Sequence, residues 1–140
     1  MSDFKKVFFD TNPLIYYLED DGTFYEKMSK FIVDNADSVF STSAVTVVEY
    51  LTGVFRKGDK EREQDFRSMI SDYKFEVVSV NRDVAEEAAR IRDKYRAFKT
   101  MDSLQLAAAK LSGADLFASN DLQLKQYSDV MVLIVDEVKI

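Results

Sequence analysis

Short apolar runs alternate with helix-like patterns along the whole chain, and this alternation constrains the fold more than any other feature. The runs that predict strands are each rich in Val, Ile, Leu or Phe and cover residues 6–9, 38–41, 75–80, 116–119 and 131–135. Strands that are apolar on both faces are typical of a parallel sheet covered by helices. The pattern predicts one α/β domain over residues 1–140, with three α/β/α layers and a mainly parallel central sheet.

Capping signals place the predicted helices between these runs. Asn12 followed by Pro13 predicts the start of the first helix, with Asn12 as the N-cap. Thr23 opens a capping box that predicts the start of the second helix, and Ser43 is a candidate cap for the third. The remaining helices are predicted over residues 60–73, 81–98, 101–112 and 121–127.

The sequence contains neither histidine nor cysteine, which narrows the chemistry available to it. These absences exclude imidazole bases, thiolate nucleophiles and metal sites that depend on nitrogen or sulfur ligands. A catalytic metal would have to be bound by oxygen, and among such cations Mg²⁺ and Mn²⁺ are the usual partners of phosphate chemistry. The lack of cysteine, of a signal peptide and of a long apolar segment predicts a cytoplasmic protein without a membrane span.

Two acids directly follow predicted strands, at the edge where open parallel sheets bind ligands. Asp10 ends the run V-F-F-D, where a carboxylate beside buried apolar residues would be desolvated unless a positive or hydrogen-bonding group met it. We therefore interpret Asp10 as functional. Asp121 ends the run L-F-A-S-N-D, but there Asn120 or Asp121 could equally serve only as the cap of the last helix.

Two further acids lie on predicted helices and are ambiguous when taken alone. Asp102 lies in the first turn of a very apolar helix, where the helix dipole alone favours an acid by roughly 0.3–1 kcal/mol. Glu49 lies away from the apolar stripe of its helix, so its position by itself indicates a solvated surface residue.

Four motifs follow one another over nearly the whole chain: V-F-F-D-T-N, then S-T-S-A-V-T-V-V-E, then A-A-R-I-R-D-K-Y-R-A-F-K-T-M-D-S-L-Q-L-A-A-A, and finally G-A-D-L-F-A-S-N-D. In this order and spacing they resemble the PIN-domain nucleases, and within them the single-domain VapC-type toxins of toxin–antitoxin pairs. The family's acids fall on Asp10, Glu49, Asp102 and Asp121. Met101 stands where proline is frequent in the family, Gln105 where histidine is common and Ser119 where threonine is usual. None of these departures replaces a carboxylate.

The resemblance implies a metal-dependent endoribonuclease that is the toxin of a type II toxin–antitoxin pair. Asp10 and Asp102 would bind Mg²⁺ directly, with Mn²⁺ as a substitute, while Glu49 and Asp121 would hold a second ion or oriented waters. The polar residues beside the first and last acids would support the site, namely Thr11, Asn12, Ser119 and Asn120. The resemblance also implies an RNA substrate, a homodimer and a small antitoxin protein as partner.

A net charge of −6 is unusual for a nuclease, because phosphate contacts require Lys and Arg. The segment 90–99 nevertheless carries five basic residues and one acid and ends just before Asp102. Arg92, Arg96 and Lys99 are therefore the candidate RNA contacts. The alternative interpretation is a solvated face of an amphipathic helix.

Other small α/β proteins that bind magnesium fit the sequence less well. A phosphoacceptor receiver domain would show adjacent acids after the first strand and a Lys-Pro pair near the last strand, and neither is present. A haloacid-type phosphatase would need an aspartate where Asn12 stands. A catalytically idle PIN domain that binds RNA or a protein stays open as the alternative.

Overall fold

The computed structural model describes residues 2–140 and contains one five-stranded sheet. Its strands are β1 (Lys6–Phe9), β2 (Val39–Ser43), β3 (Glu76–Val78), β4 (Leu116–Ser119) and β5 (Met131–Ile134). Their order is β3-β2-β1-β4-β5, and every neighbouring pair is parallel. All the carboxyl ends therefore open on one edge of the sheet, with β1 in the middle. The predicted α/β class and parallel sheet are confirmed.

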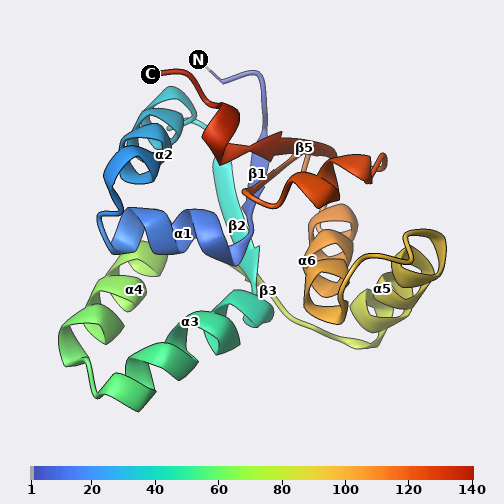
Figure 1. Ribbon diagram of the computed structural model, residues 1–140, viewed down its shortest axis with the longest axis horizontal. Helices are drawn as coiled ribbons and strands as arrows, with labels where there is room; N and C mark the ends of the chain where they lie inside the picture. The colour runs from blue at the N-terminus through green and yellow to red at the C-terminus, as the bar shows by residue number, and fades with distance from the viewer. Residues whose placement is uncertain (1) are drawn as a thin grey trace.

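Helices cover both faces of this sheet (Figure 1). The α-helices are α1 (Thr11–Leu18), α2 (Gly22–Asp34), α3 (Ala44–Lys57), α4 (Lys60–Asp72), α5 (Arg82–Lys94) and α6 (Thr100–Leu111). Two short 3₁₀ helices follow late in the chain, η1 (Leu122–Gln126) and η2 (Val135–Glu137). Helices α1 to α4 lie on one side of the sheet and α5 and α6 on the other, which confirms the three layers. Within residues 2–140 no helix is long and apolar enough to span a membrane.

The central strand divides its side chains between two hydrophobic cores. Val7 and Phe9 pack with the residues of α1 to α4, while Phe8 packs with α5, α6 and Phe117 of β4. This alternation is the period of two that a strand imposes, and Val7, Phe8 and Phe9 are all fully buried. Burial on both faces explains why an uninterrupted apolar run could be recognised as a strand.

The structure corrects two of the predicted helix starts and one helix type. Asn12 is not an N-cap, because Asp10 caps α1 and Pro13 falls at its third residue, where a missing N–H is still tolerated. The second helix begins at Gly22 after Asp21, so Thr23 lies inside it. The helix predicted over 121–127 is the 3₁₀ helix η1. Ser43 is confirmed as the cap of α3.

Candidate active site

Asp10 lies where the central strand turns into α1, and its carboxylate is hydrogen-bonded on both oxygens. The Thr11 backbone N–H donates to Oδ1 at 2.9 Å, and the Ser119 hydroxyl donates to Oδ2 at 2.9 Å from the end of β4. The Asp10 backbone N–H continues the sheet by donating to the Ala118 carbonyl. Only 7% of the Asp10 surface is exposed. The turn therefore holds a buried acid in a defined orientation.

Burial raises the pKa of Asp10 to about 6, since a desolvated carboxylate favours its neutral form. The hydrogen bonds from Thr11 and Ser119 lower the pKa, whereas the nearby charges of Asp102 and Glu49 raise it further. The surroundings of Asp10 therefore destabilise its ionised form, and a cation bound beside it would stabilise that form.

Glu49 reaches this site from α3, although its side chain lies on the exposed surface of that helix. The Thr11 hydroxyl donates to Glu49 Oε1 at 2.6 Å. The helical position of Glu49 predicts a solvated surface residue, and the residue is exposed. Its carboxylate nevertheless accepts a hydrogen bond from Thr11, the neighbour of Asp10. The contact joins residues 38 positions apart in the chain, which helical periodicity cannot predict.

Asp102 and Asp121 approach from α6 and from the turn after β4. Asp102 is half-buried in the first turn of α6, and burial followed by the charges of Asp121 and Glu49 raises its pKa, while Lys99 lowers it. No residue in the described part of the chain hydrogen-bonds the Asp102 carboxylate. Asp121 instead caps η1 by accepting from the Gln123 N–H at 3.0 Å. Among the described residues, the Asp102 carboxylate is therefore not tied by a hydrogen bond and is available to a ligand.

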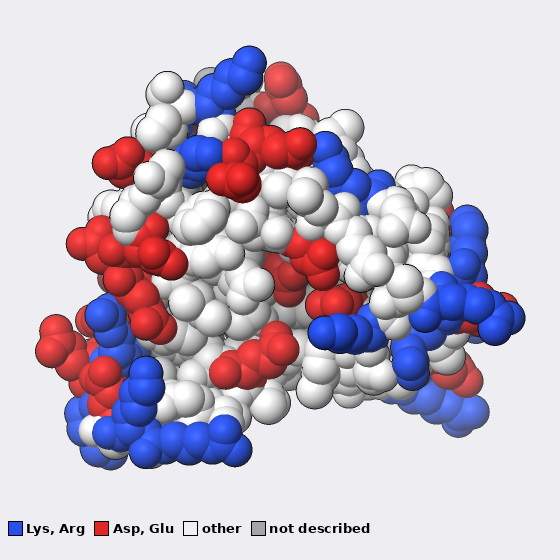
Figure 2. Space-filling view, viewed as in Figure 1, with Lys and Arg blue, Asp and Glu red and all other residues white. Residues whose placement is uncertain are grey.

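Figure 2 shows acidic side chains around a hollow in the middle of one face, where α1, α3 and α6 approach one another. Asp102 and Glu49 are close enough to Asp10 to raise its pKa, and Asp121 and Glu49 are close enough to Asp102 to raise the pKa of that acid. Among residues 2–140, however, no three acids lie close enough to share one metal ion as they stand. Their oxygen donors are of the kind that a hard cation prefers.

The supporting residues differ in their contacts. Thr11 and Ser119 are buried and bind Glu49 and Asp10, respectively. Asn120 donates to the Tyr16 hydroxyl at 3.2 Å and accepts from the Asp136 N–H at 3.0 Å, so it joins other segments of the chain. Asn12 is exposed on the first turn of α1. The structure brings the two hydroxyls, but not the Asn120 amide, into contact with the acids.

Two further buried polar residues border the acids, Gln105, which the family resemblance set near the site without a role, and Thr46, which the sequence did not indicate. Gln105 Nε2 donates to Thr46 Oγ1 at 2.8 Å and lies 3.3 Å from Thr11 Oγ1 and 3.4 Å from Asp10 Oδ1. Their exposed fractions are 1% for Gln105 and 0% for Thr46. The signal that could have found them is a polar residue on the buried side of an otherwise apolar helix, which requires a hydrogen-bonding partner.

The basic residues in the last turn of α5 and in its connection to α6 lie on the surface. Arg92, Arg96 and Lys99 are exposed, and none of them pairs with an acid within 4.0 Å among residues 2–140. Figure 2 shows basic side chains beside the acidic hollow on the side of α5. Lys99 is near enough to Asp102 to lower the pKa of that acid. Of the three, Lys99 lies close to the acids, and all three are free to meet an anionic ligand without first breaking an ion pair.

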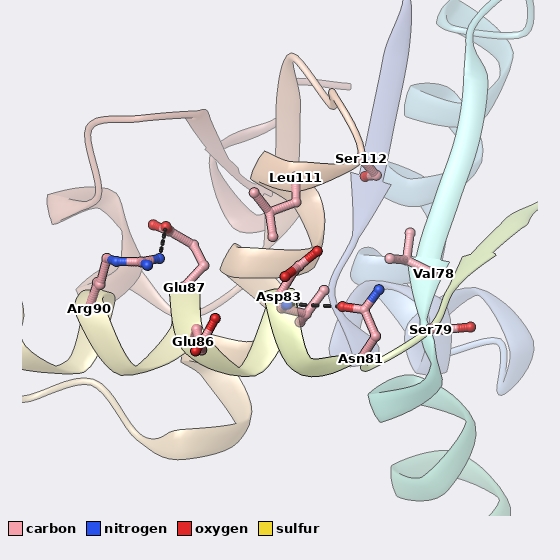
Figure 3. Close-up of a pocket in the computed structure, with 10 residues that line it drawn as sticks. Val78, Ser79, Asn81, Asp83, Glu86, Glu87, Arg90, Leu111 and Ser112 are labelled. Carbon is pink, nitrogen blue, oxygen red and sulfur yellow. Dashed lines mark hydrogen bonds and ion pairs between the residues drawn. The ribbon is translucent and has the colours of Figure 1, made fainter.

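A separate cavity of about 510 Å³ lies between the end of β3, α5 and the end of α6 (Figure 3). None of the four predicted acids lines it. Its acids include Glu87, which is already paired with Arg90 at 3.0 Å and with Lys110 at 3.2 Å. The cavity is therefore distinct from the candidate active site.

Comparison with solved structures gives the same fold. VapBC2 from Rickettsia felis, bound to a promoter DNA fragment, has a TM-score of 0.78 at 14% identity and covers 92% of this chain and 98% of its own. FitAcB from Neisseria gonorrhoeae has a TM-score of 0.75 at 19% identity, with 94% and 99% covered. VapC20 from Mycobacterium tuberculosis, a toxin that cleaves the sarcin-ricin loop, has a TM-score of 0.67 at 17% identity, with 89% and 98% covered. At such identities the likeness establishes the fold.

Sequence comparison identifies the family. A search of curated protein sequences gives no match. The family model of the PIN domain matches residues 7–130, which include all four predicted acids. Because this match spans most of the chain and agrees with the fold, the protein belongs to the PIN-domain family.

Proposed function

We propose that this chain is a metal-dependent endoribonuclease and the toxin of a type II toxin–antitoxin pair. The observation that carries the proposal is Asp10, a buried acid on the central strand whose pKa is raised to about 6 and whose charge is opposed by Asp102 and Glu49. Acids that merely cap helices do not need such surroundings. A cluster of this kind favours a cation, which removes the mutual repulsion.

The metal would be Mg²⁺, with Mn²⁺ as a substitute, because the available donors are carboxylate and hydroxyl oxygens. Asp10 and Asp102 would hold it, and Glu49 and Asp121 would hold a second ion or orient water. When bound, such an ion lowers the pKa of a coordinated water and offsets charge on the scissile phosphate. Thr11 and Ser119 keep the Glu49 and Asp10 carboxylates oriented through their hydrogen bonds.

An RNA substrate is supported by the basic side chains beside the hollow. Arg92, Arg96 and Lys99 are exposed and unpaired among the described residues, so they can neutralise phosphates without first breaking an ion pair. Contacts of this kind position the backbone of RNA and carry no sequence information. The acids would then act on a strand held at the edge of the hollow.

A toxin role is supported by the similar structures, which include VapBC structures from several bacteria, one of them described as a member of the VapBC family of toxin–antitoxin systems. By this likeness we propose a small antitoxin protein as the partner that restrains the site. The homodimer implied by the sequence resemblance stays a prediction, which the mass of the purified protein in solution can test.

The proposal is tested by incubating the purified protein with total RNA in Mg²⁺, in Mn²⁺ and in a chelator, beside the Asp10→Asn and Asp102→Asn variants. We expect cleavage that requires the metal and is lost in both variants. Circular dichroism of each variant provides the control for folding. RNA binding without cleavage in every metal would contradict the enzyme and identify the idle binding module instead.

A further inference from the structure

A buried polar cluster borders Asp10 and Thr11. It consists of Ser43 at the end of β2, Thr46 in the first turn of α3 and Gln105 in α6, each with at most 1% of its surface exposed. Polar groups buried this deeply are costly unless their hydrogen bonds are made. The donors and acceptors of the cluster therefore determine how its side chains are oriented.

Ser43 determines which way the Gln105 amide points. The Val45 backbone N–H donates to Ser43 Oγ at 3.1 Å, so the Ser43 hydrogen is free to donate to Gln105 Oε1 at 2.6 Å. The amide oxygen thus faces Ser43, and the NH₂ group, which can only donate, faces the opposite side. There it lies 2.8 Å from Thr46 Oγ1, 3.3 Å from Thr11 Oγ1 and 3.4 Å from Asp10 Oδ1, and the two threonine oxygens are the nearer acceptors for its two hydrogens.

This orientation decides the role of the Thr11 hydroxyl, which has a single hydrogen. The Gln105 NH₂ group approaches Thr11 Oγ1 as a donor, and so it occupies a lone pair of that oxygen. The carboxylate of Glu49 lies 2.6 Å from the same oxygen and can only accept. The hydrogen of Thr11 is therefore directed at Glu49. At its 3.0 Å contact with Thr46 Oγ1 the Thr11 oxygen accepts, since Thr46 Oγ1 itself accepts from Gln105 and keeps its hydrogen to donate.

Glu49 depends on this hydrogen for its position. Its side chain is exposed on α3, and the Thr11 hydroxyl is the hydrogen-bond donor that it has among residues 2–140. An exposed glutamate without a partner samples several rotamers, because ordering a long side chain costs entropy. The chain of contacts from Ser43 through Gln105 and Thr11 ends at an acid of the active site.

We propose that Gln105 is a positioning residue, whose amide orients the Thr11 hydroxyl as a donor to Glu49 and thereby holds the Glu49 carboxylate beside Asp10. The consequence for metal binding rests on the proposed function, because it treats Glu49 as one of the acids that hold the ion. The positioning itself is a property of the metal-free protein and can be measured there.

The first test measures the Glu49 side chain by NMR in the metal-free protein. Gln105→Met keeps the length and apolar bulk of the side chain and removes its donor and acceptor. We expect one Glu49 rotamer in the wild type and several in Gln105→Met. Ser43→Ala, which frees the amide to turn, should give an intermediate result and serves if Gln105→Met does not fold. An unchanged Glu49 rotamer in the folded variants would overturn the proposal.

Ser41→Ala provides a matched control for the loss of a buried polar group. The Ser41 hydroxyl is fully buried and donates to the Val7 carbonyl at 3.1 Å, with no contact to Thr11 or Glu49. This variant should lower the melting temperature and leave the Glu49 rotamer unchanged. If Ser41→Ala also gave several Glu49 rotamers, the effect would come from a general loss of packing, and a specific role for Gln105 would be overturned.

The second test measures Mn²⁺ binding by calorimetry in a double-mutant cycle. Gln105→Met should weaken binding by about tenfold, as is typical when a group that orients a metal ligand is removed. In the Glu49→Gln background the same change should have almost no effect, because Gln105 acts through Glu49. Equal losses in both backgrounds would overturn the proposal. A wild-type protein that binds no Mn²⁺ would contradict the proposed function, while the rotamer measurement would still decide the positioning.

Discussion

The ends of β1 and β4 have the same sequence pattern, an apolar run followed by a polar turn with an acid, yet they hold two different carboxylates. Asp10 is buried, binds Ser119 across the sheet, and has its pKa raised to about 6. Asp121 is partly exposed and accepts a local hydrogen bond from the Gln123 N–H. The sequence pattern predicts that an acid lies at the edge of the sheet. The contacts that bury or expose the acid come from other segments, and at Asp10 they raise its pKa.

The difference follows from the position of each strand end. Asp10 lies between β2 and β4, so that α3 and α6 both bring side chains over it. Asp121 follows β4, and the short helix that it caps turns the chain back toward the outer strand β5. The central position desolvates the first acid, whereas the second can serve as a cap and still face Asp102. We therefore expect the two acids to respond differently to the same substitution.

The largest expected difference is in catalysis. Asp10→Asn should reduce kcat/KM for cleavage of a short fluorogenic RNA by at least about 100-fold, because it removes charge that would hold the metal directly. Asp121→Asn should reduce it by about tenfold, as expected for a group that orients rather than binds. Initial rates in saturating Mn²⁺ provide the measurement. Equal losses in the two variants would show that Asp10 and Asp121 contribute equally to catalysis, contrary to the different roles assigned to them.

The pH dependence of the free energy of unfolding of the metal-free protein should also distinguish Asp10 from Asp121. Because the pKa of Asp10 is raised from 3.8 to about 6 on folding, the folded state binds this proton more tightly than the unfolded state. The contribution of Asp10 to stability is therefore most favourable below pH 4, falls as the pH rises toward 6, and stays about 3 kcal/mol lower above that.

Urea unfolding between pH 4 and pH 7 measures this effect. The Asp10→Asn variant should gain roughly 2 kcal/mol relative to the wild type over that interval, since it lacks the titrating group and the unfolded-state pKa of 3.8 already lies close to pH 4. Asp121→Asn should keep most of the wild-type pH dependence, because Asp10 is unchanged in it. A constant difference between Asp10→Asn and the wild type across the interval would contradict the buried, repelled state of Asp10.

The sequence was sufficient for the elements whose signal is local. The strands at both acids were predicted with their observed bounds, Lys6–Phe9 and Leu116–Ser119, because each is an apolar run closed by polar residues. The edge strand β3 is shorter than the predicted 75–80, since only Glu76–Val78 find partners on β2. Residues at an edge have one neighbour, and propensity alone cannot locate where pairing stops.

The parts of the site that could not be predicted depend on contacts between distant segments. Ser43 was recognised as a helix cap from its neighbours, but its bond to Gln105 joins residues 62 positions apart. Asn12 was expected to cap α1 because Pro13 follows it, whereas Asp10 makes that bond and is also the buried acid of the site. The Asp10 side chain thus both caps α1 and forms part of the candidate site. A sequence motif gives each residue a single role and so does not predict this combination.

Ser119→Ala tests a side chain that connects the two strand ends. The Ser119 hydroxyl donates to Asp10 Oδ2 at 2.9 Å and its oxygen accepts from the Asp121 N–H at 3.1 Å. Its removal should raise the pKa of Asp10 further, because the charged carboxylate loses a donor, and should cost about 1–2 kcal/mol of stability at pH 7. At pH 4, where Asp10 is protonated, the cost should be smaller because the lost bond no longer involves a charge. Urea unfolding at the two pH values checks this, and an equal cost at both would mean that Ser119 stabilises the turn at Asp121 and not the charge of Asp10.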